Sequence, residues 1–236
     1  MREPVVFLPA MMCDARLFGP LIADLSRDHA VMSAPVTHGE RIEEIASGLL
    51  DVLPKRFALV GLGMGGVVAL EVIRRAPDRV SRLCLMDTTP LADTPQQAAA
   101  RDPQIIRVRT GKLEEVMAEE LKQSDLAPGP HRAEILALVA DMAQGLGPEC
   151  YVRQARAMQR RRDQQTTLRK IAVPTLVMCG SQDSVWPVKR HTFMAELIPG
   201  AQLTVIDHAG HLPPLEQPDA VGAALRNWLA QPLVLR

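Results

Sequence analysis

The sequence predicts one α/β domain, built on a mostly parallel sheet of about six strands with helices on both faces and an inserted helical cap. Short apolar runs of strand length alternate along the chain with helical patterns, which is typical of a parallel sheet. The length of 236 residues suits one large domain, or one domain that carries an insertion. One segment, 88–173, interrupts the alternation and far exceeds the dozen or so residues that a crossover needs.

The strands and helices of the sheet region follow in a regular order. Residues 57–62, Phe-Ala-Leu-Val-Gly-Leu, have almost no polar side chains and indicate a strand that is buried on both faces. Similar apolar runs predict the other strands, at 5–8, 30–33, 80–87, 175–179 and 202–206. Amphipathic spacing predicts the helices at 17–25, 41–53, 65–76, 188–197 and 219–229.

The long interruption has a helical pattern of its own. Amphipathic spacing predicts helices at 113–122, 132–144 and 149–162, separated by Pro- and Gly-containing loops. We therefore predict a helical cap at 91–167, inserted into a core formed by 1–90 and 168–236.

Composition excludes several classes of function. Lys plus Arg and Asp plus Glu are both 27, so the chain lacks the net positive charge on which non-specific nucleic-acid binding depends. Aromatic residues make up only 3%, which leaves few platforms for base stacking. No apolar run approaches the roughly 20 residues of a membrane span. We expect neither a nucleic acid nor a membrane as a partner.

The cysteines and the N-terminus predict an ordinary intracellular protein. Cys13, Cys84, Cys150 and Cys179 are widely spaced and lack the pairing of a zinc site, so we expect reduced thiols, no metal and no cofactor. Residues 1–4 lead straight into a strand without a signal-peptide pattern, which predicts a cytoplasmic location. A monomer or a homodimer is equally compatible with the sequence.

Three loops at the ends of predicted strands carry the chemistry. Strand 57–62 runs through Gly61-Leu62-Gly63-Met64-Gly65 directly into a helix, and a side chain at either flanking glycine would collide in so tight a turn. Asp183 follows strand 175–179, and His211 follows strand 202–206. The order of glycine turn, acid and histidine matches a hydrolase triad in which the nucleophile comes first.

Together these features resemble the α/β-hydrolase family, in particular small capped bacterial esterases. The resemblance covers nearly the whole chain. It includes Leu8-Pro9-Ala10-Met11 in place of the usual His-Gly loop, the glycine turn, the Asp183 loop, Gly210-His211 and the Glu216-x-Pro218 helix start. The full family fold begins with two antiparallel strands, and the resemblance implies that this chain lacks them.

The resemblance implies a role for each residue. His211 is the general base, oriented by Asp183, and the backbone N–H groups of Met11 and Met64 form the oxyanion hole. Gly63 stands at the nucleophile position, where the family has serine. The implied substrate is a small molecule with an ester, lactone, thioester or amide group.

Several assignments have alternatives. Asp87 also ends a strand and could supply the carboxylate, whereas Asp183 could merely cap the helix that follows it. We expect His208 and His38 to be solvated loop residues. Glu216 is expected to cap the last helix or to form an ion pair there.

The lining of the substrate pocket is also predicted. Met11 and Met64 are expected in it from their position, and Met12, Met142 and Met158 are further candidates for an adaptable apolar wall. Among the arginines of the cap, Arg160 is the candidate for binding an anionic group of the substrate. The other cap arginines are expected on the solvated face, where glutamates balance their charge: Arg107, Arg109, Arg153, Arg156, Arg161 and Arg162.

Gly63 has two interpretations. Without a hydroxyl or thiol no covalent acyl-enzyme can form there, so this chain is expected to be inactive or much weakened. Either an active serine hydrolase has been altered to glycine and binds its substrate without turnover, or the chain is a natural non-catalytic homologue that binds a small molecule. Gly63→Ser is expected to fit sterically and to bring its Oγ within hydrogen-bond reach of His211.

Overall fold

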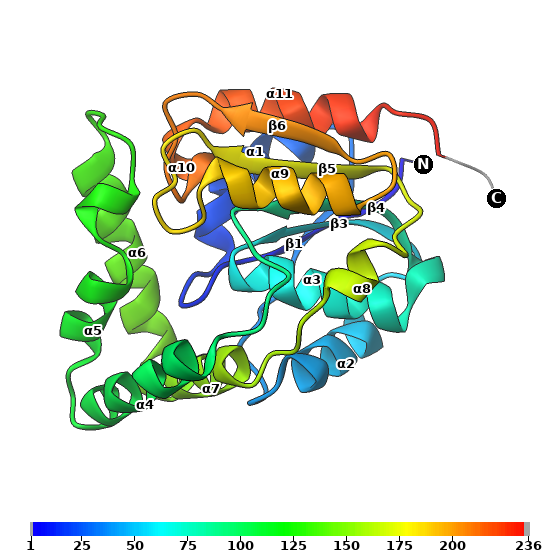
Figure 1. The fold of residues 1–236 in the computed structure, drawn as a ribbon. Helices are drawn as coiled ribbons and strands as arrows, with labels where there is room; N and C mark the ends of the chain where they lie inside the picture. The colour runs from blue at the N-terminus through cyan, green and yellow to red at the C-terminus, as the bar shows by residue number, and fades with distance from the viewer. Residues whose placement is uncertain (1, 234–236) are drawn as a thin grey trace.

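A computed structural model describes residues 2–233. Its centre is one sheet of six parallel strands in the order β2-β1-β3-β4-β5-β6, which confirms the predicted fold (Figure 1). The strands are β1 (Val5–Leu8), β2 (Val31–Ser33), β3 (Phe57–Leu62), β4 (Val80–Met86), β5 (Thr175–Gly180) and β6 (Gln202–Ile206). Every residue of β1, β3, β4 and β5 is buried, as the apolar runs predicted, whereas the edge strands are partly exposed.

Helices cover both faces of the sheet (Figure 1). One face packs against α2 (Ile42–Val52), α3 (Met64–Arg75) and α9 (Val188–Leu197), with the short α8 (Gln165–Leu168) beside them. The other face packs against α1 (Gly19–Leu25) and α11 (Pro218–Leu229), where Trp228 is the largest fully buried side chain. The single turn α10 (Pro213–Glu216) precedes α11, and 3₁₀ turns lie at Ala15–Phe18, Pro77–Arg79 and Gln123–Asp125.

Of the α-helices between β4 and β5 in the sequence, the four that precede α8 stand beside the sheet, at the left and below it in Figure 1. They are α4 (Pro95–Arg109), α5 (Leu113–Glu120), α6 (Arg132–Leu146) and α7 (Pro148–Gln159). We call these four the inserted helices. They share a small core in which Tyr151 is fully buried among Ile105, Val108 and Val116.

Two side chains of α7 tie the inserted helices to loops of the sheet. The Gln154 side chain accepts a hydrogen bond from Met12 N at 2.8 Å and donates one to Val36 O at 3.1 Å. Arg153 Nε donates to Thr37 O at 3.0 Å. These bonds fix α7 over the loops that follow β1 and β2.

The structure differs from the sequence-based prediction mainly in the first inserted helix. No separate helix was predicted at 95–109, because only Ile105 and Val108 of α4 are buried and Pro103 lies inside it. The helix predicted at 149–162 begins at Pro148 and ends at Gln159. Among residues 2–233, no helix is long and apolar enough to cross a bilayer.

Candidate active site

The turn between β3 and α3 has the strained backbone of a nucleophile elbow, although its central residue is a glycine. Gly63 has φ +55° and ψ −119°, a conformation that L side chains rarely adopt. Its N–H donates to Met86 O at 3.0 Å, and its carbonyl accepts from Thr88 Oγ1 at 2.6 Å. A Cβ at Gly61 would collide with the Gly65 carbonyl, and a Cβ at Gly65 with the Leu8 carbonyl, so both flanking glycines are required by space.

Asp183 and His211 come together from two loops. Asp183 Oδ2 lies 3.1 Å from His211 Nδ1, and the carboxylate is buried while the imidazole is partly exposed. Asp183 Oδ1 also accepts from Val185 N at 2.8 Å and from Trp186 N at 3.0 Å, so this side chain caps its loop and contacts the histidine at once. Burial opposes its ionisation, but hydrogen bonds from His211, Trp186 and Asp87 lower the pKa of Asp183.

Asp87 lies beside this pair but has no direct bond to the histidine among the described residues. It follows β4 with φ +36°, is fully buried, and accepts from Gly180 N at 3.0 Å. Burial and then the charge of Asp183 raise the pKa of Asp87 well above its ordinary value. Its other oxygen, Oδ2, is buried and has no hydrogen-bond partner among the described residues, surroundings that suit a protonated carboxyl group.

Asp87, Asp183 and His211 present ligand atoms within 4.8 Å of one another, which makes them the candidate metal group within residues 2–233. The hydrogen bonds of both carboxylates, however, already account for this grouping.

Backbone bonds fix the histidine loop to the segment before α6. His211 N donates to Asp125 O at 2.8 Å. The Glu216 carboxylate accepts from Gly210 N, Leu212 N and Ala127 N at 2.8, 2.8 and 2.7 Å. Glu216 thus does more than cap a helix or form an ion pair. Its carboxylate accepts from the residues on both sides of His211 and from the inserted segment.

A second histidine, His191, is buried behind the turn and supports it. His191 Nε2 accepts from Thr88 N at 3.2 Å, and the Thr88 hydroxyl in turn holds the Gly63 carbonyl. The imidazole is fully buried, and this burial lowers the pKa of His191 to about 4, so the ring is neutral. Sequence reasoning did not single out His191 or Thr88.

A cavity of about 190 Å³ lies above Gly63, at the carboxyl edge of the sheet and against the inserted helices. Met11, Gly63, Met64 and His211 all line it. Among residues 2–233, the N–H groups of Met11 and Met64 have no acceptor within the protein. They are therefore free to donate to a ligand. Parallel α/β sheets bind ligands at this edge.

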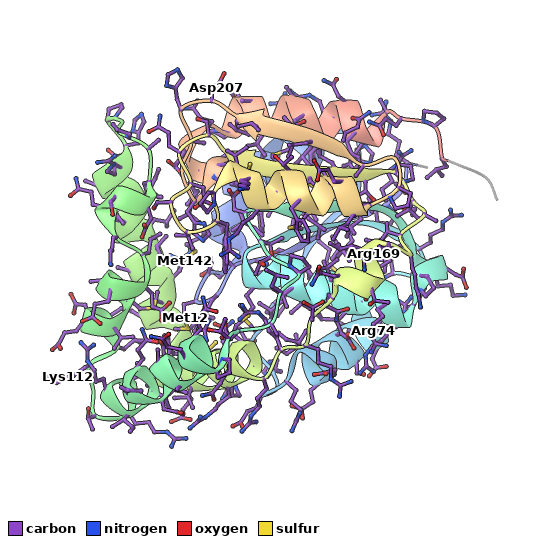
Figure 2. All side chains as sticks on the ribbon, in the orientation of Figure 1. Met12, Arg74, Lys112, Met142, Arg169 and Asp207 are labelled. Atoms are coloured by element: carbon purple, nitrogen blue, oxygen red, sulfur yellow. The ribbon has the colours of Figure 1, made fainter. Side chains whose placement is uncertain are left out.

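The predicted substrate-binding residues divide into two groups. Met158 lines the cavity. Met12 and Met142, both labelled in Figure 2, do not: each is fully buried, and Met142 Sδ accepts from Asp14 N. Arg160 lies away from the cavity as well, since it pairs with Glu40 on the surface at 3.2 Å.

The cavity also has a polar end that the sequence did not indicate. Arg101 of α4, Glu120 of α5 and Tyr151 of α7 line it there, and the Tyr151 hydroxyl donates to Glu120 Oε1 at 3.0 Å. The remaining predictions concern the protein surface and the thiols. His208 and His38 are both exposed, as expected of solvated loop residues, and all four cysteines are free and buried.

Comparison with known proteins agrees with this geometry. The sequence profile of the alpha/beta hydrolase family matches residues 5–224. A pimeloyl-[acyl-carrier protein] methyl ester esterase from Neisseria meningitidis is 27% identical over 203 residues, which cover 83% of this chain and 78% of that protein. A 2-hydroxymuconate semialdehyde hydrolase from Pseudomonas putida is 27% identical over 195 residues, covering 80% and 68%.

Solved structures share the fold. A thermophilic esterase from Thermogutta terrifontis superposes with a TM-score of 0.87 at 29% identity, covering 96% of this chain and 89% of that one. An enol-lactonase from Burkholderia xenovorans LB400 reaches a TM-score of 0.86 at 23% identity, covering 98% and 92%. At that identity the second likeness concerns the fold alone.

Proposed function

The chain belongs to the alpha/beta hydrolase family, and on that premise we propose that its cavity binds a small molecule with an ester, lactone, thioester or amide group. The observation that carries the proposal is the arrangement around Gly63. The turn, Met11 and Met64 with their free N–H groups, and His211, which pairs with Asp183, line the same cavity. In this proposal the inserted helices, at 91–167, form the cap over that cavity.

The chemistry would be acyl transfer to water, and a serine at 63 would complete it. The serine Oγ attacks the carbonyl carbon while its proton passes to His211 Nε2, and Asp183 stabilises the imidazolium that forms. The N–H groups of Met11 and Met64 stabilise the oxyanion. The leaving alcohol, thiol or amine takes the proton from His211, and water then hydrolyses the acyl-enzyme by the same route.

With Gly63 the acyl-enzyme cannot form, so we propose that this chain binds its substrate with little or no turnover. The oxyanion donors and binding alone leave about 10³–10⁴-fold acceleration over water when a triad serine is removed. A bound ester would therefore persist in the cavity. We interpret the chain as a nucleophile-less form of a serine hydrolase.

One contact favours the second candidate, a natural binding protein without catalysis. A Cβ added at Gly63 would lie 3.2 Å from the Ala10 Cβ, closer than side chains normally approach. This corrects the expectation that a serine fits freely, because Ala10 must give way by a few tenths of an ångström. Ala10 also precedes Met11, so its displacement would move an oxyanion donor. If glycine had stood at position 63 naturally, the neighbouring loop could have acquired a side chain such as that of Ala10, which leaves little room for a serine.

The test is a set of three proteins assayed with p-nitrophenyl esters, lactones, thioesters and amides. These are the chain itself, Gly63→Ser, and the double variant Ala10→Gly/Gly63→Ser. We expect hydrolysis to rise by at least about 10³-fold in the double variant, since a triad serine contributes more than that to the rate. His211→Ala in the same background should abolish the gain.

The single variant separates the two candidates. If Gly63→Ser is as active as the double variant, the chain is an altered serine hydrolase. If only the double variant is active, the result favours the natural binding protein, in which glycine belongs at position 63. If both serine variants fold, bind esters and hydrolyse none of the panel, the hydrolase proposal is wrong and the binding protein remains.

A further inference from the structure

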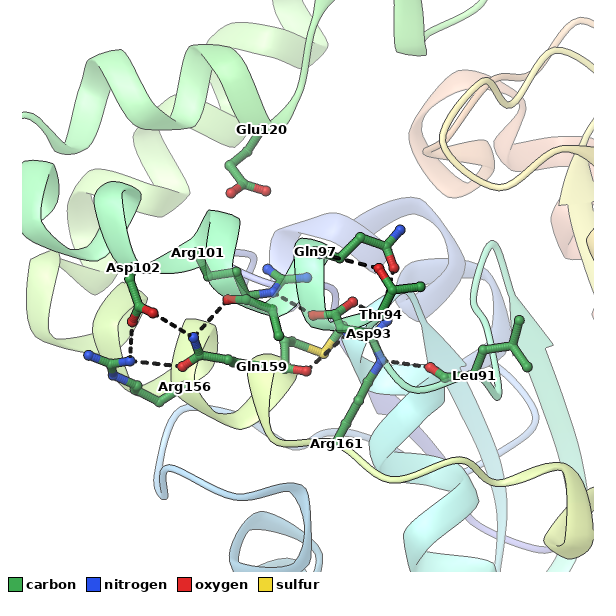
Figure 3. Close-up of polar contacts among 12 residues, drawn as sticks. Leu91, Asp93, Thr94, Gln97, Arg101, Asp102, Glu120, Arg156, Gln159 and Arg161 are labelled. Atoms are coloured by element: carbon green, nitrogen blue, oxygen red, sulfur yellow. Dashed lines mark hydrogen bonds and ion pairs between the residues drawn. The ribbon is translucent and has the colours of Figure 1, made fainter.

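The end of the cavity that α4, α5 and α7 form holds two opposite charges that do not pair with each other. Arg101, Glu120 and Tyr151 form this end, which we call the polar end, and the neighbouring wall is apolar, with Met117, Leu121 and Val139. Within residues 2–233 no ion pair joins Arg101 to Glu120, and Figure 3 draws Glu120 without a bond to the arginine. Arg101 and Glu120 are both half-buried in the wall of this cavity, so any of their polar atoms without a protein partner is available to a ligand.

Arg101 has hydrogen-bond donors to spare. Its Nε donates to Asp93 at 2.8 Å, whereas its two terminal nitrogens have no partner among the described residues (Figure 3). Asp93 is almost fully buried and is shared with Arg161, whose Nη2 lies 2.8 Å from it. Arg161 is engaged further, since it donates to the carbonyls of Leu91 and Met158. Asp93 and Arg161 therefore balance each other, and the positive charge of Arg101 is left for the cavity.

Glu120 has an acceptor to spare. Its Oε1 accepts from the fully buried Tyr151 hydroxyl, and its Oε2 has no donor within the part of the chain that the structure describes. A phenol satisfies one lone pair without neutralising the carboxylate. One cation and one anion thus face the same small cavity with free hydrogen-bonding atoms.

A ligand group with a single charge would satisfy one of these residues and face a like charge on the other. A group that is itself dipolar satisfies both, because a carboxylate matches the fork of a guanidinium and an ammonium matches a carboxylate. We propose that the polar end binds the zwitterionic head of a small ligand, an α-amino-acid group, with its carboxylate on Arg101 and its ammonium on Glu120.

This inference rests on the proposed function, in which the other end of the ligand lies over Gly63. The volume of about 190 Å³ is below the usual range for drug-sized ligands, so the ligand is small. An amino-acid head joined by a short aliphatic chain to an ester would place polar groups at both ends and apolar carbons against Met117 and Leu121.

The experiment measures binding by calorimetry to the chain as it exists, with Gly63, so that no turnover is needed. Four esters of matched length differ only at the far end: methyl hexanoate, monomethyl adipate, methyl aminocaproate and α-aminoadipate δ-methyl ester. Each ester is also tested with a chain one methylene shorter and one methylene longer, so that a mismatch between chain length and cavity depth does not hide binding. We expect the zwitterionic ester to bind at least about tenfold more tightly than each of the other three, which corresponds to about 1.4 kcal/mol.

Two variants and a control assign the charges. Arg101→Met should remove the advantage that a carboxylate confers, and Glu120→Gln, which keeps an acceptor for Tyr151, should remove the advantage of the ammonium. Arg109→Met changes an exposed arginine on the same helix and should alter nothing. Circular dichroism checks that each variant folds, and if Arg101→Met does not, Glu120→Gln with the two ammonium-bearing esters decides alone.

The inference is overturned if methyl hexanoate binds as tightly as the zwitterionic ester, or if Glu120→Gln leaves the ranking unchanged. A preference for monomethyl adipate or for methyl aminocaproate alone would also overturn it, since it would assign a single charge. Because these measurements use the Gly63 chain, they stand apart from the hydrolysis assay. Zwitterion binding without hydrolysis by the serine variants would refute only the hydrolase proposal.

Discussion

At the residue scale, two buried groups near the site change the pH dependence of stability in opposite directions. The pKa of Asp87 is 3.8 in the unfolded chain and is raised in the native state. Above pH 3.8 the unfolded chain therefore loses a proton that the native state keeps, and Asp87 lowers the stability as the pH rises. The pKa of His191 is 6.5 in the unfolded chain and about 4 in the native state. Between these two pH values only the unfolded chain binds the proton, so His191 lowers the stability as the pH falls. Over the interval in which both apply, the two effects oppose each other.

Replacing Asp87 by Asn should expose the effect of His191. The amide keeps an acceptor for Gly180 N and a donor toward Asp183, but it no longer takes up a proton. We expect the free energy of unfolding of Asp87→Asn to fall more steeply than that of the parent as pH drops from 6.5 to 4, by up to about 1.4 kcal/mol per pH unit.

Urea unfolding at several pH values measures this difference in slope. Asp51→Asn, an exposed carboxylate on α2, is the matched control and should leave the slope unchanged. Parallel curves for Asp87→Asn and the parent would show that Asp87 is ionised in the native state.

The sequence predicted the positions at the ends of strands better than the side chains on helices. Gly63, Asp183 and His211 each follow a strand, and parallel strands end at one edge, so their convergence could be foreseen. Met12 does not line the cavity: it has a φ of +55°, and its side chain is buried in the core of the inserted helices. The roles of Arg101 and Glu120 depend on how α4 and α5 pack, which no local pattern specifies.

At the element scale, the first inserted helix shows which signal was missed. Thr94 caps α4 through a reciprocal pair of bonds with Gln97, and Pro95 occupies the first turn. Thr-Pro-x-Gln is a recognisable helix start, but the polar sequence after it lacks the apolar period on which the prediction depended. Because α4 was missed, so was Arg101, which faces the cavity from it. The sheet helices were predicted to within a few residues because their buried faces impose that period.

The loop of His211 depends on one side chain from α10. Glu216→Gln leaves a single carboxamide oxygen where two carboxylate oxygens accepted three N–H groups, and it turns an amide donor toward another donor. We expect a loss of about 2 kcal/mol in the free energy of unfolding, within the range for hydrogen bonds to charged groups. Ligand affinity, or the activity of the serine variant, should fall with it because His211 is no longer held.

Urea unfolding and binding of the best ester of the series measure the two effects. Glu114→Gln on α5 removes an exposed carboxylate without a partner among the described residues and serves as the control. Unchanged binding in a destabilised Glu216→Gln would show that Glu216 supports the fold without positioning the histidine.

At the scale of the whole molecule, the inserted helices form a third small core joined to the sheet at a few defined points. Gln154 and Arg153 hold one end over the loops after β1 and β2. Asp125 and Ala127 hold the other end to the loop of His211. The cavity lies between these attachments, so a ligand there contacts the sheet and the inserted helices at once.

The attachment at Asp125 also links access to the cavity with the protection of particular amide hydrogens. Within the part of the chain that the structure describes, His211 N–H is bound only to a carbonyl of the inserted segment, and Ala127 N–H only to Glu216 across the same junction. Any excursion that lifts this segment from the sheet therefore frees both hydrogens together. In hydrogen–deuterium exchange the two amides should share one protection factor, lower than that of the strand amides of β3. A bound ester should slow both by the same factor, so two backbone positions would report how often the cavity opens.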